Sequence, residues 1–161
     1  MNPAPPTSST RTGAGLRAIV WGGLLCGVLD ITAAFVVYGF FGAKPIPLLQ
    51  GIAAGLLGPQ AFSGGLATAA LGLFCHFFIA FSAAAVYYAA SRWLPFAVQH
   101  AVAGGVFFGV CVYFFMNRVV VPLSASRKFP FSFKMMAIGV TIHIFCVGLP
   151  IAFAVRRFST E

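Results

Sequence analysis

Three ionisable residues stand inside long apolar stretches of this chain: Asp30, His76 and His143. Ionisable groups in the middle of a bilayer are costly, so they usually face the protein interior and serve a purpose. Asp30 shares one helical face with Gly23 and Gly27, which precede it by seven and three residues. Each histidine has a glycine four residues earlier, which favours a close helix contact beside each ring. We therefore predict an intramembrane polar centre formed by Asp30, His76 and His143.

Several kinds of chemistry would suit such a centre. A histidine titrates near neutral pH, so the histidines could form a proton or ion relay with Asp30. His76 and His143 could instead ligate b-type haem between helices. A metal site would add Cys75 and Cys146, which lie close to the histidines in the chain. In a purely structural role, each histidine donates a hydrogen bond across the bundle. We expect no cofactor or metal, and keep haem and metal as alternatives.

A second polar group stands near the end of the third apolar stretch. Tyr113 and Asn117 follow Gly109 at intervals of four residues and share its helical face, and Arg118 comes next. Tyr113 and Asn117 could line a polar mouth, or they could bond to a neighbouring helix. Arg118 is expected to extend to the lipid head groups.

Two motifs occur twice in the chain. The pattern GG-x-x-x-G-V stands at 22–28 and 104–110, and the pattern A-x-G-x-x-x-H-x-F stands at 70–78 and 137–145. The pairs suggest two helical hairpins in tandem, both beginning on the same side of the membrane. Chance similarity in a chain with 18 glycines is the alternative. Small residues at i, i+4 spacing favour close helix packing. The glycines expected to pack in this way are Gly23, Gly27, Gly105 and Gly109.

The composition determines the class of protein. Apolar residues make up 60% of the 161 residues, and charged residues only 7%, against about 25% in soluble domains. This balance excludes a water-soluble globular protein and a disordered chain. The net charge is +8, but the basic residues are scattered between apolar stretches and form no stripe that would bind nucleic acid. The expected partners are a lipid bilayer and either further copies of the chain or a larger membrane complex.

Four stretches are long enough to cross a bilayer, which needs about 20 mostly apolar residues. In lipid the backbone must satisfy its own hydrogen bonds, so these stretches are expected to be helices. We predict an all-α membrane protein: a disordered tail at 1–15, then one four-helix bundle at 16–158. The expected spans are 17–41, 66–90, 98–121 and 135–155.

The link between the first two spans contains a shorter apolar segment, PIPLLQGIAAGLL, at 45–57. Thirteen residues are too few for a span, so a re-entrant or interfacial helix is expected, with the interfacial helix favoured. Gly51, Gly55 and Gly58 fall on one face, which could pack closely on another helix.

An even number of spans places both termini on one side of the membrane. Lysine and arginine divide five to five between the two sides, or five to four when Arg118 is discounted. The positive-inside rule therefore favours cytoplasmic termini by a difference of one basic residue at most. The chain contains no GxSxG, HExxH or Walker A sequence, so we do not predict an enzyme.

Several segments resemble a family of small, uncharacterised bacterial integral membrane proteins with four predicted spans. The resemblance implies a bacterial inner membrane and adds no catalytic residue. With the polar residues, it leads to a working hypothesis of a small transporter-like or accessory membrane subunit. A b-type haem protein and a purely structural subunit of a membrane complex are the alternatives. The resembling segments lie at 22–40, 48–65, 70–81, 116–125 and 142–152.

Overall fold

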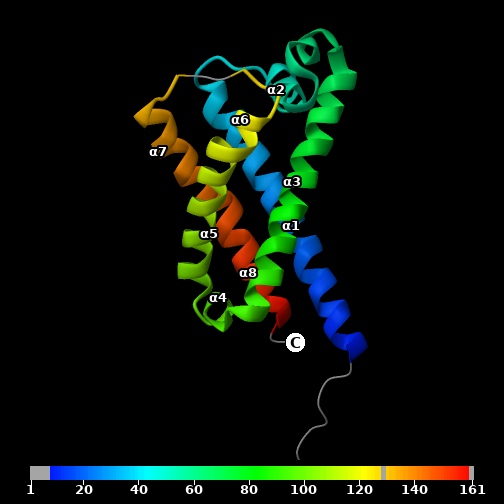
Figure 1. The fold of residues 1–161 in the computed structure, drawn as a ribbon, viewed down its shortest axis with the longest axis vertical. Coiled ribbons are helices and arrows are strands. Elements are labelled where there is room, and N and C mark those ends of the chain that lie inside the picture. Colours follow the sequence, from blue (N-terminus) through cyan, green and yellow to red (C-terminus); the bar gives the residue numbers. More distant parts are fainter. Residues whose placement is uncertain (1–7, 128–129, 160–161) are drawn as a thin grey trace, which may run out of the picture.

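The computed structural model describes residues 8–127 and 130–159, and helices make up most of this part of the chain (Figure 1). Two short segments, η2 and η3, are π-helical, and η1 is a 3-10 helix. The elements in order are α1 (Ser8–Gly39), α2 (Pro45–Leu57), η1 (Gly58–Ser63), α3 (Gly65–Trp93), α4 (Pro95–Gln99), α5 (Ala101–Phe115), η2 (Met116–Val120), α6 (Val121–Leu123), α7 (Phe133–Ile142), η3 (His143–Gly148) and α8 (Leu149–Ser159).

Four helical stretches of the described residues are long and apolar enough to cross a membrane: Gly13–Gly39, Gly65–Trp93, Ala101–Leu123 and Phe133–Ser159. The prediction of an all-α bundle with four spans is therefore confirmed. Helix α1 begins at Ser8, so residues 8–15 of the expected tail are helical, and residues 1–7 lie outside the described part.

The four spans run alternately up and down the bundle (Figure 1). The beginning of α1 and the end of α8 lie at one end, whereas α2 and the link from α6 to α7 lie at the other. Helix α8 packs against both α1 and α5, and α3 packs against α1. The fourth span, formed by α7, η3 and α8, therefore holds the first and third spans together.

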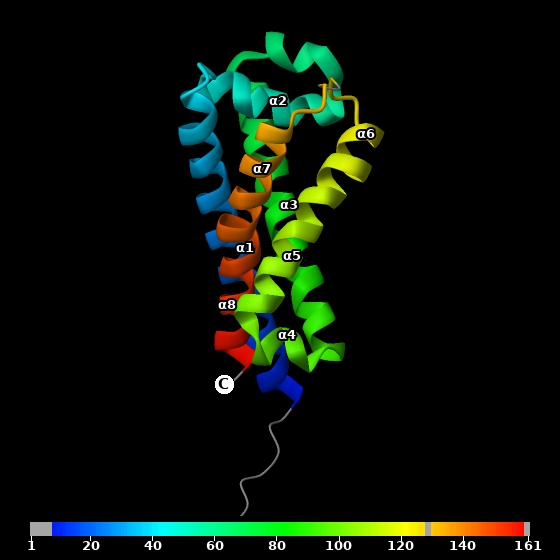
Figure 2. The ribbon, with the colours of Figure 1, turned by 90° about the vertical axis from the view of Figure 1, so that its left-hand side faces the viewer.

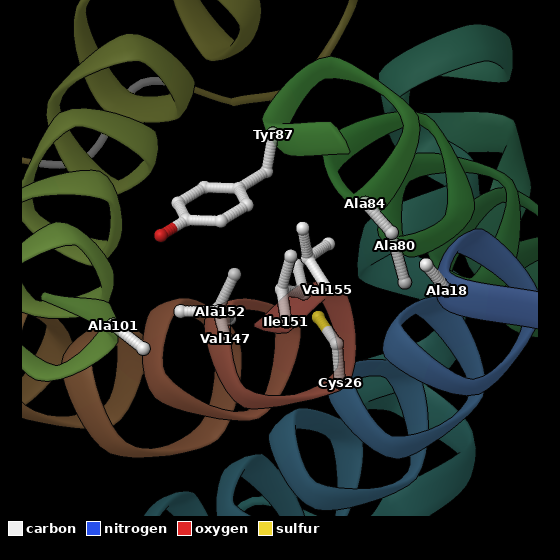
Figure 3. Packing of buried hydrophobic residues seen from close by; sticks show 10 residues of the cluster. All are labelled: Ala18, Cys26, Ala80, Ala84, Tyr87, Ala101, Val147, Ile151, Ala152 and Val155. Carbon is white, nitrogen blue, oxygen red and sulfur yellow. The ribbon is translucent and has the colours of Figure 1, made fainter. Parts of the chain in front are cut away.

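The core of the bundle is built from small side chains (Figure 3). Ile151 and Val155 are the largest fully buried residues among those described. Small core residues let helices approach closely, which is how helices associate in lipid. The ten residues of this core are Ala18, Cys26, Ala80, Ala84, Tyr87, Ala101, Val147, Ile151, Ala152 and Val155.

Helix α2 occupies the expected residues and lies across the end of the bundle (Figure 2). Its buried Gln50 donates from Nε2 to the carbonyl oxygen of Gly65, at 2.9 Å, and to Oγ1 of Thr68, at 3.4 Å. The Thr68 hydroxyl in turn donates to the carbonyl oxygen of Ala61, at 2.6 Å. Gln50 therefore ties α2 to the start of α3 through donation to a backbone carbonyl oxygen and to a hydroxyl group.

The face of α2 that packs on α3 differs from the expected glycine face. Gln50, Ala53 and Ala54 are buried, and Gly72 of α3 lies directly against the backbone of α2. Gly51 has open space where a side chain would stand. Gly55 instead faces the link after α6, where its carbonyl oxygen accepts a hydrogen bond from the N–H of Ala125, at 3.0 Å. The buried face of α2 therefore consists of two alanines and the hydrogen-bonded Gln50, and not of the three glycines.

Candidate functional site

His76 joins α3 to α1. Its Nε2 donates a hydrogen bond to the carbonyl oxygen of Gly27, at 2.8 Å, and its ring meets the edge of the Phe77 ring. Gly27 makes this approach feasible, because a Cβ there would collide with the Phe77 ring. His76 is half-buried. The arrangement is the cross-bundle hydrogen bond expected of a structural histidine.

His143 is held within its own span. Its Nδ1 donates to the carbonyl oxygen of Gly139, one turn earlier, at 2.9 Å. The ring of Tyr113 packs edge-on against it, with ring centres 5.4 Å apart. Gly139 leaves room for that tyrosine ring, because a Cβ there would overlap it. This bond uses Nδ1, and no hydrogen bond to Nε2 of His143 is observed within the described residues.

His143 also begins the π-helical segment η3. The N–H of Leu149 donates to the carbonyl oxygen of Ile144, five residues back, instead of four. Pro150 follows and has no N–H to donate, so the carbonyl oxygen of Cys146 lacks its usual α-helical partner. Single π-helical turns inside α-helices are frequent at functional sites. Here the irregular turn stands in the middle of a membrane span.

Asp30 is half-buried in α1 and faces the same part of the fourth span. Its carboxyl group lies within electrostatic range of the thiol of Cys26, one turn earlier, and of the thiol of Cys146 in η3. The hydroxyl group of Tyr38, farther along α1, lies within the same range. Within residues 13–127 and 130–159, no hydrogen bond to the Asp30 carboxyl group is observed. An acid inside a span therefore stands beside an irregular turn with its oxygens open to a further partner.

A line of half-buried polar groups links Asp30 to His143. The Tyr38 hydroxyl lies within electrostatic range of Asp30 and of Tyr113 in α5. The Tyr113 ring contacts the His143 ring directly. We call Asp30, Tyr38, Tyr113 and His143 the polar line. Each of these side chains can bind or release a proton.

The structure does not join the three residues of the predicted centre in direct contact. No contact is observed among Asp30, His76 and His143 in the described part of the chain. A shared centre of these three residues stays a prediction. The sequence analysis missed Cys26 and Tyr38, although Cys26 lies four residues before Asp30 and therefore on its face.

The residues named for the metal and haem alternatives stay predictions, and the structure shows only how their side chains are placed. The described residues contain no group of three His, Cys, Asp or Glu side chains close enough to hold a metal ion. Cys75 and Cys146 are half-buried free thiols. For haem, the Nε2 of His76 would have to leave Gly27, to which it donates.

The residues of the predicted polar mouth separate in the structure. Asn117 and Arg118 are exposed within η2, and Nδ2 of Asn117 donates to the carbonyl oxygen of Tyr113, one turn back, at 2.9 Å. The ring of Tyr113 points instead toward His143. Tyr113 therefore belongs to the polar line, and Asn117 and Arg118 face outward.

The repeated motifs make equivalent contacts within each hairpin. A Cβ at Gly27 would meet Phe77, the residue after His76, and a Cβ at Gly109 would meet Ile144, the residue after His143. Likewise, Gly23 lies against Phe81 and Gly105 lies against Gly148, each five residues after its histidine. The two glycine helices therefore pack on the two histidine helices in the same register.

The contacts between the hairpins repeat as well. Gly22 of the first hairpin lies against Ala154 of the second, and Gly104 of the second lies against Tyr87 of the first. Tyr87 and Ala154 each stand eleven residues after a histidine. Such reciprocal contacts are the mark of a twofold relation. The core of Figure 3 contains further equivalent pairs, Ala80 with Val147 and Ala84 with Ile151. Asp30 breaks the symmetry, because Val112 takes its place in the second hairpin.

A comparison with protein-family models, curated proteins and solved structures finds no match to this chain. The chain is a polytopic helical protein of membrane type.

Proposed function

We propose that the chain is a small membrane transport protein that carries a proton across the bilayer, with Asp30 as the group that binds it. The observation that carries this proposal is the state of Asp30. It is half-buried in a membrane-spanning helix, and no described residue hydrogen-bonds its carboxyl group. An acid inside a span is a functional site by default, because its cost must be offset by a benefit.

The polar line supplies a route for the proton. The hydroxyl groups of Tyr38 and Tyr113 can each donate and accept a hydrogen bond, and a histidine ring can take a proton on one nitrogen while it releases one from the other. Water between these groups would complete the relay. The π-helical segment η3 beside Asp30 supports the proposal, since such turns are frequent at functional sites.

The tandem arrangement of the hairpins agrees with a transport role. Many transporters are built from two repeats, with the site for the coupling ion near the middle of the membrane, where the repeats meet. Asp30 lies on α1 of the first hairpin, within electrostatic range of Cys146 on η3 of the second. The resemblance to bacterial membrane proteins supports a bacterial inner membrane, and the distribution of basic residues supports cytoplasmic termini.

The proposal can be tested with the purified chain in sealed vesicles that contain a pH-sensitive dye. A potassium gradient and valinomycin provide the driving voltage. Vesicles with the native chain should acidify faster than empty vesicles, and Asp30→Asn should reduce the rate to that of empty vesicles. Thr32→Val is the matched control, because Thr32 is an exposed polar residue two positions away on the same helix.

Two results would overturn the proposal: no flux above empty vesicles with the native chain, or full flux with Asp30→Asn. Either result would leave the role of an accessory or structural subunit, for which a stable larger complex on native gels is the expected sign. A haem protein would show a Soret band after purification in mild detergent.

A further inference from the structure

An apolar groove runs along the outside of the bundle between α1 and the fourth span. Its volume is about 640 Å³, within the range of sites that hold small molecules. Apolar side chains, most of them exposed or half-buried, form its walls, and a single charged residue stands among them. The residues that define it are Trp21, Leu25 and Leu29 of α1, together with Leu149, Phe153 and Arg157 of α8.

The length of the groove matches one leaflet of a bilayer. Phe145 and Arg157 both line it and are twelve residues apart on the fourth span. At a rise of about 1.5 Å per residue they are about 18 Å apart. Half of a hydrocarbon core of about 30 Å is about 15 Å. The groove therefore begins near the middle of the membrane and ends at the head groups.

Positive charge gathers at the outer end of the groove. Arg157 lines it directly, and Arg156 is its neighbour in the last turn of α8. Helix α1 runs antiparallel to α8, with Gly22 against Ile151 and Ala154. Arg17, just over one turn before Gly22, therefore lies at the level of the end of α8. An apolar hollow one leaflet deep, with arginines at its outer end, complements an anionic lipid.

We propose that this groove binds an anionic glycerophospholipid, with an acyl chain along Leu25, Leu29 and Leu149 and the phosphate at Arg157. The apolar walls recognise the chain, and a guanidinium group forms paired hydrogen bonds to phosphate oxygens. Trp21 stands beside this position, and its indole suits the membrane–water boundary. The site is independent of the polar line and of proton transport.

The two tryptophans of the chain allow a direct test. In the Trp93→Phe variant, all tryptophan fluorescence comes from Trp21. This variant is placed in bilayers containing phosphatidylglycerol or phosphatidylcholine with brominated acyl chains, which quench tryptophan on contact. Brominated phosphatidylglycerol should occupy the site about fivefold more strongly than brominated phosphatidylcholine, as expected from about 1 kcal/mol per basic residue at a membrane surface. Arg157→Gln in this variant should remove the preference.

Two controls separate a site from general surface charge. Arg92→Gln removes a basic residue at the end of α3 and should leave the preference at Trp21 unchanged. The Trp21→Phe variant reports instead from Trp93, which is exposed beside Arg92 and should show a weaker preference. Circular dichroism confirms that each variant is folded.

Three outcomes would overturn the proposal. Equal preference at Trp21 and Trp93 would mean that charge alone attracts the lipid. A preference that survives Arg157→Gln would remove the assigned phosphate position. If neither brominated lipid quenches Trp21, the groove is covered by protein, and a second copy of the chain is its occupant.

Discussion

His76 of α3 and Gly27 of α1 are joined by a hydrogen bond of 2.8 Å from the imidazole Nε2 to the backbone carbonyl oxygen. The bond is made possible by the absence of a side chain at Gly27, where a Cβ would collide with Phe77. At the equivalent place in the second hairpin, Gly109 lies against the backbone of His143, whose ring turns instead toward Tyr113. The two hairpins thus pack in the same register, but His76 joins two helices by a hydrogen bond, whereas the ring of His143 belongs to the polar line.

The first prediction tests the structural role of His76. Replacement by Phe keeps a ring of similar size but removes the hydrogen bond to Gly27. We expect a loss of about 0.6 kcal/mol, the average for side-chain hydrogen bonds between membrane helices. Thermal unfolding in mild detergent measures it. His100→Phe is the control, since His100 is exposed. Equal stability of His76→Phe and the native chain would contradict the role.

The second prediction concerns the crossing of α5 and η3. A Cβ at Gly109 would stand 2.8 Å from Cα of Ile144, and this contact is between backbones that cannot rotate away. Gly109→Ala should therefore destabilise the bundle by about 1–3 kcal/mol, the usual cost of overpacking.

Gly51→Ala is the matched control for that substitution. Gly51 is helical and has open space at its Cβ position. Alanine favours a helix over glycine by about 1 kcal/mol, so Gly51→Ala should leave stability unchanged or raise it. A similar loss from both substitutions would contradict the prediction, because it would show that the loss at Gly109 does not come from close packing on η3.

The spans and the short helix could be predicted from the sequence because they depend on run length and hydropathy. Pro45 and Leu57 bound α2 in both the expectation and the structure. The packing face of α2 could not be predicted in the same way. Three glycines suggested one face, but the partner of Gln50 lies fifteen residues away at Gly65, and periodicity within one helix carries no information about that partner.

The contacts of the polar residues could not be predicted from the sequence either. Asp30, His76 and His143 could be singled out because ionisable residues are rare in apolar stretches. Which of them share neighbours depends on how each helix is rotated about its own axis. The π-helical turn at η3 shifts that rotation for every later residue of the span, and hydropathy does not detect it.

The third prediction tests the anchor of α2. Gln50→Leu would remove the donor to the carbonyl oxygen of Gly65 and would leave Thr68 without this partner. We expect a loss of about 0.5–1.5 kcal/mol, the net contribution of a typical hydrogen bond, because the Gly65 carbonyl oxygen keeps the Thr68 hydroxyl as a donor. Gln60→Leu is the control, since Gln60 is exposed in the neighbouring segment. Protease sensitivity of the 40–64 region, compared between the two variants, would show whether α2 has detached.

The fourth prediction concerns topology. The beginning of α1 and the end of α8 lie at the same end of the bundle (Figure 1). Reporter fusions at residue 5 and residue 158 should therefore give the same side of the membrane, and a reporter in the link after α6 should give the other. Opposite results at the two ends would contradict four spans. Mixed signals at both ends would indicate insertion in both orientations, which the near-equal distribution of basic residues permits.

The last prediction separates the function of Asp30 from the stability of the bundle. Because no described residue hydrogen-bonds its carboxyl group, Asp30→Leu breaks no hydrogen bond in that part of the structure. It also removes an acid whose insertion at the centre of a span costs about 2.5–3.5 kcal/mol. Asp30→Leu should therefore unfold at the same temperature as the native chain or higher, while proton flux into vesicles is lost. Asp30→Asn should keep the same stability and also lose the flux. If Asp30→Leu instead lowers stability as much as Gly109→Ala, the carboxyl group holds the helices together, and its place in the span is explained without transport.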